Sequence, residues 1–194
     1  MACATSFDVK RGTSAFLLRL HSEDGTNRLT RSLVEALSGA IRDLARANLP
    51  IVITGNERFF STGADLNEIA KLHGPSAYEF SQVGQELMAR IQDFPAPVVA
   101  AISGYCMGGG LDLALACTSR IASPHSIFGH RGAALGLITG WGGTQRLPRL
   151  VGRARAIEML IAAEKLSAAR ALEFGLIDAI ADDPVAEAWR RLKC

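Results

Sequence analysis

Residues 97–117 (PVVAAISGYCMGGGLDLALAC) carry the strongest structural signal in the sequence. The proline and the β-branched apolar run predict a buried strand, and the Leu/Ala-rich run after residue 110 predicts a buried helix. Four glycines, Gly104 and Gly108 to Gly110, lie between them. The backbone N–H groups of such a turn are bare and lie at the positive end of the helix dipole. The turn therefore suits an anion or an oxygen that becomes negative during a reaction, and close backbone packing without any ligand stays an open alternative.

Three well-known glycine motifs do not fit this turn. A P-loop ends in Gly-Lys-Ser/Thr, but Leu111 follows Gly110. A dinucleotide-binding fingerprint requires Gly-x-Gly-x-x-Gly, which no register over residues 104–113 provides. A nucleophile elbow requires Gly-x-Ser-x-Gly, which the residues around Ser103 do not form. These three assignments are excluded.

Length and composition indicate a soluble globular enzyme. The 194 residues suffice for one domain with a real core, and we expect a single domain over 1–194. Hydrophobic residues make up 48% and charged residues 21% of the chain, which is ordinary for this class. A net charge of +2 without a basic block argues against a nucleic-acid partner. The N-terminus shows neither the basic segment nor the apolar run of a signal peptide.

The cysteines and histidines do not predict a metal site or a redox cofactor. The cysteines lack the close pairs of a zinc site, and the histidines form no cluster with them; these residues are Cys3, Cys106, Cys117 and Cys194, and His21, His73, His125 and His130. We expect reduced thiols in a cytoplasmic protein. Residues 96–116 are apolar enough to resemble a membrane span, but the glycines and Asp112 favour a buried strand–turn–helix, so no membrane partner is expected.

A second strand–turn–helix unit precedes the first. Residues 51–55 predict a strand covered on both faces, and residues 59–66 form a small-residue turn into a short helix ending near residue 72. If the two units lie side by side, N–H groups from both turns converge, as an oxyanion requires. Losing such a donor costs roughly 3 kcal/mol of transition-state stabilisation.

The remaining pattern is a strand–strand–helix rhythm that hints at a spiral of parallel strands. Ser76 with Glu79 predicts a capping box for a helix that reaches about Asp93. Other strands are predicted at 14–20 and 120–123, and other helices at 30–47, 153–163 and 168–174 after a Ser167 cap.

Four motifs follow one another along the chain: STGADL at 61–66, GYCMGGG at 104–110, GWGGTQRL at 140–147 and A-x-x-A-x-x-x-G-L-I-D at 168–178. Together they resemble the crotonase, or enoyl-CoA hydratase/isomerase, superfamily over about residues 14–181. The resemblance implies an α/β fold, a ββα superhelix (spiral), assembled as a homo-oligomer (trimer or hexamer). Family members continue into further helices, so the C-terminal helical part is expected to be short or missing here.

The resemblance also implies an acyl-CoA substrate and a role in fatty acid metabolism. Two backbone N–H groups hold the thioester oxygen, and they map to Ala64 and Gly109. Contacts to coenzyme A map loosely to Asn27, Arg28, Leu29, Gly63 and Asp65. Coenzyme A enters as part of the substrate, and no separate cofactor is implied.

The catalytic carboxylates depart from the family pattern. Hydratases of this family use two glutamates around one water, and their positions hold Asp112 and Gly132. No Asp or Glu occurs between Asp112 and Glu158 that could replace the second. His130 could act as an acid or base, and Arg131 could hold a substrate carboxylate, although structural or surface roles are open for both. A charge in an apolar stretch is costly unless it is used or paired, which favours a catalytic Asp112.

Related branches of the superfamily differ from this chain at or near the same positions. Dienoyl-CoA isomerases and benzoyl-CoA dehalogenases carry a second carboxylate where this chain has Gly140, which argues against both. Dihydroxynaphthoyl-CoA synthases share glycine at the Gly132 position and use a bound bicarbonate, but their surrounding residues match this chain poorly. A serine peptidase of the related Clp-type fold would need a Ser–His pairing that the sequence does not suggest.

The sequence therefore predicts an acyl-CoA-processing lyase or isomerase that stabilises a thioester enolate and has non-standard catalytic residues. The alternative is a catalytically impaired protein with a crotonase fold that binds coenzyme A or serves in assembly.

Overall fold

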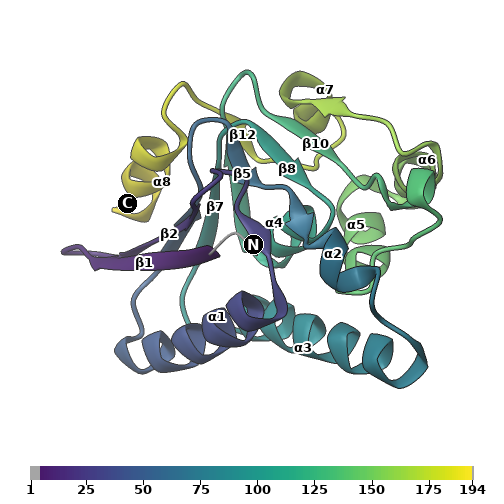
Figure 1. Ribbon diagram of the computed structural model, residues 1–194. Helices are drawn as coiled ribbons and strands as arrows, with labels where there is room; N and C mark the ends of the chain where they lie inside the picture. The colour runs from purple at the N-terminus through teal and green to yellow at the C-terminus, as the bar shows by residue number, and fades with distance from the viewer. Residues whose placement is uncertain (1–4, 194) are drawn as a thin grey trace.

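The computed structural model describes residues 5–193 as two main sheets surrounded by helices (Figure 1). In chain order the elements are β1 (Thr5–Arg11), β2 (Phe16–Ser22), β3 (Arg28–Leu29), α1 (Arg31–Leu44), η1 (Ala45–Ala47), β4 (Ile51–Thr54), β5 (Phe59–Ser61), β6 (Gly63–Ala64), α2 (Leu66–Ile69), α3 (Gly74–Gln92), β7 (Val98–Ile102), β8 (Tyr105–Met107), α4 (Gly109–Ala116), β9 (Ser119–Ala122), β10 (Ile127–Gly129), η2 (Gly132–Leu135), α5 (Gly143–Val151), α6 (Arg153–Ala162), β11 (Leu166–Ser167), α7 (Ala168–Glu173), β12 (Ala179–Ile180) and α8 (Pro184–Leu192).

From β4 to β10 the chain alternates between the two main sheets, apart from β6, which pairs with β3 in a separate two-stranded sheet. The larger sheet has the order β1-β2-β4-β7-β9-β12 and is parallel except for the antiparallel pair β1–β2. The smaller sheet has the order β11-β10-β8-β5, in which β5, β8 and β10 are parallel. Over this range each repeat adds one strand to each sheet, as in β4 then β5, β7 then β8, and β9 then β10. The predicted α/β spiral of ββα units is confirmed.

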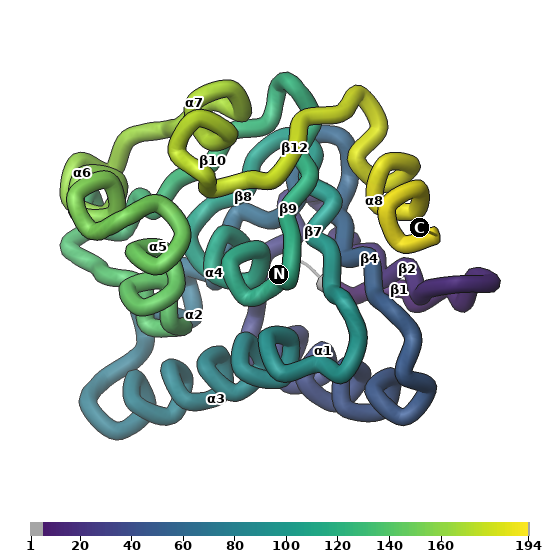
Figure 2. Tube along the Cα trace, turned by 180° about the vertical axis from the view of Figure 1, so that it is seen from behind, coloured from purple at the N-terminus to yellow at the C-terminus, as the bar shows by residue number. Residues whose placement is uncertain are grey.

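Helix α4 lies at the centre of the molecule (Figures 1 and 2). All of its residues from Gly110 to Ala116 are buried, because the Leu/Ala run leaves no polar face. Helices α1 and α3 run along one side, and α8 lies on the flank of the larger sheet away from α6 (Figure 2). Because α4 begins where β8 ends, its first-turn amides are presented inside the fold.

The amphipathic helix predicted at 30–47 is confirmed as α1 and η1. Thr30 caps it, since its hydroxyl accepts a hydrogen bond from the Leu33 amide. The membrane-like stretch 96–116 is a buried strand–turn–helix, as predicted. Within residues 5–193, no helix is both long and apolar enough to cross a membrane.

The start of α3 was predicted wrongly. The helix begins at Gly74, so Ser76 is the third helical residue of a capping box and not its N-cap, which is His73; the Ser76 hydroxyl accepts a hydrogen bond from the His73 amide at 3.0 Å. The prediction left Gly74 and Pro75 outside the helix, but proline is well tolerated in a first helical turn. The predicted end near Asp93 is confirmed, because α3 ends at Gln92. Elements β1, α5 and α8 lie where the pattern predicted none.

The described thiols, Cys106 and Cys117, are free and buried. Burial raises the pKa of both, and that of Cys117 to about 12. They are therefore protonated, inert thiols at neutral pH. Cys3 and Cys194 lie outside the described residues.

Arg120 of β9 connects the larger sheet to the segment after α7 through hydrogen bonds and an ion pair. It is 4% exposed and donates to the carbonyls of Leu176 and Cys117, both at 2.8 Å. Its guanidinium also lies 3.2 Å from the Asp178 carboxylate. We expect Arg120→Ala to destabilise the fold by about 3–5 kcal/mol, because it leaves buried carbonyls without a donor. Urea unfolding measures this loss.

Arg42 supplies the matched control. Its pair with Asp43 spans 3.6 Å, and both side chains are more than 60% exposed. Arg42→Ala should change the free energy of unfolding by less than about 1 kcal/mol. Equal losses for the two variants would contradict the structural role of Arg120.

Candidate active site

The two glycine-containing turns meet inside the fold. Strand β5 pairs with β8, and β6 follows β5 directly, so Ala64 lies next to the start of α4. A Cβ atom on Gly63 would lie 2.9 Å from the Gly109 amide nitrogen, and one on Gly109 would lie 3.2 Å from the Ala64 amide nitrogen. Gly109 opens α4, so its N–H has no carbonyl to bond within the helix. The structure thus brings together the two predicted oxyanion donors, whose role stays a prediction.

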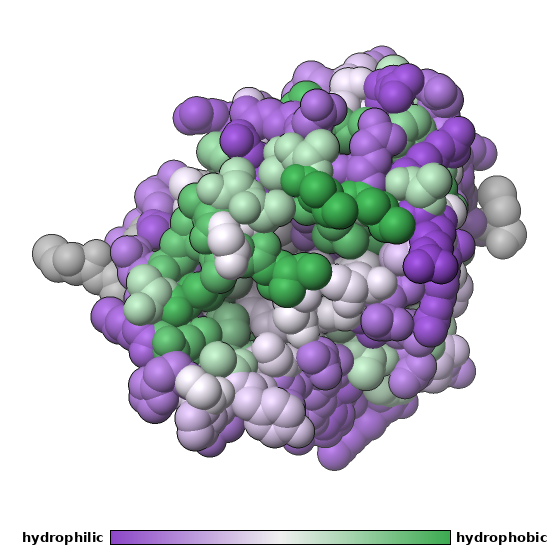
Figure 3. All heavy atoms as spheres, turned by 90° about the vertical axis from the view of Figure 1, so that its right-hand side faces the viewer, coloured by the Kyte–Doolittle hydropathy of each residue, from purple (hydrophilic) through white to green (hydrophobic). Residues whose placement is uncertain are grey.

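A pocket of about 450 Å³ opens beside these amides. Its walls come from the turn before α2, from α2 and α3, from the start of α4, from the loop 130–141 and from α6. Figure 3 faces this side of the molecule and shows apolar side chains gathered around a hollow. The lining is largely apolar, and Asp112 is the one carboxylate among the described residues that form it.

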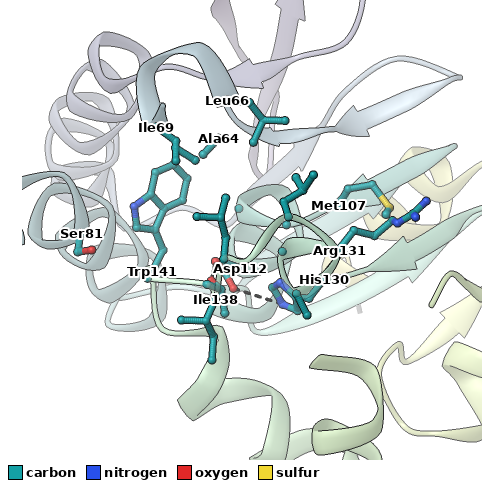
Figure 4. A pocket seen from close by; sticks show the side chains of 18 of the residues that line it. Ala64, Leu66, Ile69, Ser81, Met107, Asp112, His130, Arg131, Ile138 and Trp141 are labelled. Atoms are coloured by element: carbon teal, nitrogen blue, oxygen red, sulfur yellow. Dashed lines mark hydrogen bonds and ion pairs between the residues drawn. The ribbon is translucent and has the colours of Figure 1, made fainter. Parts of the chain in front are cut away.

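Asp112 lies at the floor of the pocket, in the first turn of α4 (Figure 4). It is 1% exposed, and the Thr139 hydroxyl donates a hydrogen bond to Oδ2. The other oxygen, Oδ1, lies 3.5 Å from His130 Nε2. Within the described part of the chain, neither of these two buried atoms has a hydrogen-bond partner. A carboxylate oxygen and an imidazole nitrogen are therefore left available for a proton or a ligand.

On the side of α5, Asp112 leaves no room for another side chain. A Cβ atom on Gly143 would lie 2.1 Å from Asp112 Oδ1 and 3.1 Å from His130 Cε1. The second glycine of the Gly142-Gly143 pair thus lets α5 begin directly against the carboxylate. Any side chain at residue 143 would displace the acidic group, so this glycine positions Asp112.

Burial shifts the pKa values of Asp112 and His130 so that the uncharged form of each is favoured. It raises the pKa of Asp112 to about 7, although the Thr139 hydrogen bond and the positive charge of Arg146 pull in the opposite direction. It lowers the pKa of His130 to about 4, so this imidazole is neutral at pH 7. Asp112 can therefore gain or lose a proton near neutrality, which suits a general acid or base.

Gly132 opens the 3₁₀ turn η2 at the rim of the pocket. A Cβ atom on Gly132 would lie 2.7 Å from the Leu137 carbonyl oxygen, so the loop folds onto the position where the family pattern has its second glutamate. Arg131 next to it is exposed, lines the pocket and points away from Asp112 (Figure 4). No second carboxylate enters the pocket from the residues that the structure describes.

The residues predicted to contact coenzyme A also come together, through the parallel pairing of β3 with β6. Their side chains, however, are largely engaged within the protein. Asn27 is buried and donates to the Phe59 and Phe60 carbonyls, at 2.9 and 3.2 Å. Leu29 is fully buried.

The charged side chains of Arg28 and Asp65 also bind other groups of the protein. Arg28 contacts the Asp24 and Asp65 carboxylates, and Asp65 caps α2 through the Asn67 and Glu68 amides. Gly63 has a φ of +95° that places the Ala64 amide. Thr62 and Ala64, rather than Gly63 or Asp65, line the pocket. Contacts to a ligand from the five predicted positions stay a prediction.

Two site residues were missed by the sequence reasoning. Thr139 bonds Asp112 across 27 residues of chain, and no local pattern signals that contact. Trp141 lines the pocket and is 3% exposed, although it stands within a glycine-rich motif. A large aromatic residue among the three glycines of this motif was the available signal, since glycines make room for such a ring.

The family model and the curated relative that match this chain point to the same family. The family model described as enoyl-CoA hydratase/isomerase matches residues 11–193. A curated protein of Bacillus subtilis (strain 168), described as a probable enoyl-CoA hydratase, is 41% identical over 171 residues. That alignment covers 86% of this chain, and the chain spans 66% of the relative's length.

Solved structures agree with this match. The structure of Pseudomonas aeruginosa DspI is 34% identical with a TM-score of 0.91, covering 96% of this chain and 78% of that one. An enoyl-CoA hydratase from Bacillus anthracis is 33% identical with a TM-score of 0.91, covering 96% of this chain and 75% of that one. The likeness extends over nearly all of the present chain.

Proposed function

The chain belongs to the enoyl-CoA hydratase/isomerase family, and we propose that it acts on an acyl-CoA thioester by stabilising the enolate of that thioester. One observation carries this proposal. The Ala64 and Gly109 amides meet on the wall of a largely apolar pocket whose described lining contains a single carboxylate, Asp112. Two backbone donors and one acid/base are the groups that proton transfer next to a thioester requires.

In the proposed mechanism the thioester oxygen accepts hydrogen bonds from the Ala64 and Gly109 N–H groups. The positive end of α4 adds to the stabilisation of negative charge on that oxygen. The Asp112 carboxylate takes a proton from the α-carbon, and the electron pair of the broken C–H bond moves into the thioester to give the enolate. The same carboxyl group then returns the proton to the carbon chain.

A single acid/base favours double-bond isomerisation over hydration. Hydration requires one group to activate water and another to protonate the α-carbon, whereas isomerisation moves one proton from the α-carbon to the γ-carbon. Asp112 can perform both halves of that transfer. Gly132 offers no carboxylate. The pKa of His130 is lowered to about 4, so at pH 7 this side chain is not an imidazolium that could donate a proton, and it is only a weak base.

The test compares two substrates with the same enzyme. The 3-enoyl thioester 3-hexenoyl-CoA should gain the absorbance of a conjugated enoyl thioester, and crotonyl-CoA should lose it more slowly through hydration. Faster hydration than isomerisation would contradict the proposal of a single acid/base. Tight binding of coenzyme A without turnover of either thioester would favour the alternative, a non-catalytic binding or assembly protein, which the near-complete burial of Asp112 also fits.

The pH dependence of the reaction follows from Asp112. Because burial raises the pKa of Asp112 to about 7, its ionised fraction increases through neutrality. We expect kcat/KM for 3-hexenoyl-CoA to rise about tenfold per pH unit below pH 7 and to level off above it. Steady-state rates between about pH 5 and pH 9 measure this profile. A flat profile over that range would contradict proton abstraction by Asp112.

Arg146 offers a specific variant for the same profile. Its positive charge lowers the pKa of Asp112, so Arg146→Met should move the rise in kcat/KM to higher pH. The exposed Arg42→Ala should leave the profile unchanged. A homotrimer or hexamer, a cytoplasmic location and the absence of a separate cofactor stay predictions.

A further inference from the structure

We infer that Trp141 closes the inner end of the acyl pocket and makes the protein select short acyl groups over long ones. This inference rests on the proposed acyl-CoA function and adds a specificity-determining residue to it.

The Trp141 indole is held in one orientation. Its Nε1 donates to the Phe80 carbonyl of α3 at 3.3 Å, and its ring packs on the Phe80 ring with centroids 5.3 Å apart. In Figure 4 the indole stands between Ser81 and Asp112 and reaches towards Ile69 and Ala64. A ring fixed by a hydrogen bond and an aromatic contact does not swing aside cheaply for a longer substrate.

Two glycines show that the indole fills the space between α3 and α4. A Cβ atom on Gly84 of α3 would lie 2.1 Å from Trp141, and one on Gly109 of α4 would lie 2.5 Å from it. The ring is thus in direct contact with the backbone that carries the Gly109 amide. A thioester whose oxygen reaches that amide has the indole beside it, and no chain can continue between the two helices.

The exposure of the lining residues shows which end of the pocket is open and which is closed. Leu66, Leu135 and Ile138 on its wall are exposed by 54%, 59% and 73%, so the mouth lies among them. Trp141 is 3% exposed and lies at the closed end. Removal of the indole would extend the pocket between Gly84 and Gly109, where neither residue has a side chain to block it.

The experiment compares a short and a long acyl group in three variants. Values of kcat/KM for 3-hexenoyl-CoA and 3-dodecenoyl-CoA are measured for the native protein, Trp141→Phe, Trp141→Leu and Trp189→Leu. Trp189 is the matched control, because it packs on Gly12 at the other tryptophan position, away from the pocket. Circular dichroism melts establish that each variant is folded, and Trp141→Phe keeps an aromatic ring should Trp141→Leu fail to fold.

The long-to-short ratio should rise at least about tenfold in Trp141→Leu, rise less in Trp141→Phe, and stay unchanged in Trp189→Leu. An unchanged ratio in folded Trp141 variants overturns the inference. Dissociation constants of the matching non-reactive thioethers of coenzyme A, measured by calorimetry, separate the inference from the catalytic proposal. If nothing is turned over, a shifted ratio of dissociation constants still supports the role of Trp141, and an equal ratio, or no binding of either thioether, overturns it.

Discussion

Asp112→Asn is expected to lower kcat for 3-hexenoyl-CoA by about 10²–10⁴-fold. Asparagine keeps the shape of the side chain and can still accept the Thr139 hydrogen bond, but it cannot take a proton from carbon. No other carboxylate from the described residues lines the pocket, so no neighbour replaces it. Stopped-flow or steady-state absorbance measurements give kcat, and calorimetry with a non-reactive thioether establishes that binding is retained.

Asp112→Asn, which is expected to lose activity, is also expected to gain folding stability relative to the native protein as the pH rises. Because the folded-state pKa of Asp112 is raised to about 7, the protonated carboxyl favours folding at low pH, and this contribution is lost as the pH rises through 7. Asp112→Asn cannot ionise, so its stability relative to the native protein should increase between pH 5 and pH 8. Retained activity, or a stability difference that does not change with pH, would contradict the buried acid/base assigned to Asp112.

Gly109→Ala should lower kcat by about 10²–10³-fold, the loss that follows removal of an oxyanion donor. The added Cβ atom would lie 2.5 Å from the Trp141 ring and 3.2 Å from the Ala64 amide nitrogen, between the two donors. It would occupy the space for the thioester oxygen and push the indole aside. Steady-state kinetics with 3-hexenoyl-CoA measure the loss.

Gly39→Ala is the matched control for that change. Gly39 lies in α1, and a Cβ atom there would meet nothing within 4 Å. Alanine at this position should leave kcat unchanged and stabilise the helix by about 0.5–1 kcal/mol. Neither Gly39 nor Gly109 has a positive φ, so backbone strain does not enter the comparison. Full activity in Gly109→Ala would contradict the oxyanion role of its amide.

The parts of the fold that were predictable rest on local chemistry. The apolar run before Gly104 and the Leu/Ala run after Gly110 each form the predicted element, because burial on all sides needs no partner-specific pattern. The amphipathic spacing of α1 buries Leu33 and Leu37 as expected. The spiral followed from the motifs as a family resemblance, and the order of strands in the two sheets is the detail that the structure adds.

The parts of the site that were not predictable rest on long-range contacts. His130 was proposed as an acid or base, but its 3.5 Å approach to Asp112 and its lowered pKa depend on how α5 and the loop before it cover α4. Trp141 meets Gly84 across 57 residues of chain, a pairing that no spacing rule contains. Side chains that converge from distant segments are set by packing, which local sequence patterns do not encode.

Formation of an enolate is tested most directly by exchange of the α-protons of a saturated thioester. Butyryl-CoA in D₂O has no double bond to hydrate or move, so loss of its α-proton NMR signal reports only proton removal next to the thioester. We expect the native protein to catalyse this exchange, and Asp112→Asn and Gly109→Ala to lose it while Gly39→Ala keeps it. Binding of butyryl-CoA without α-proton exchange would contradict the central claim that Ala64, Gly109 and Asp112 form and quench an enolate.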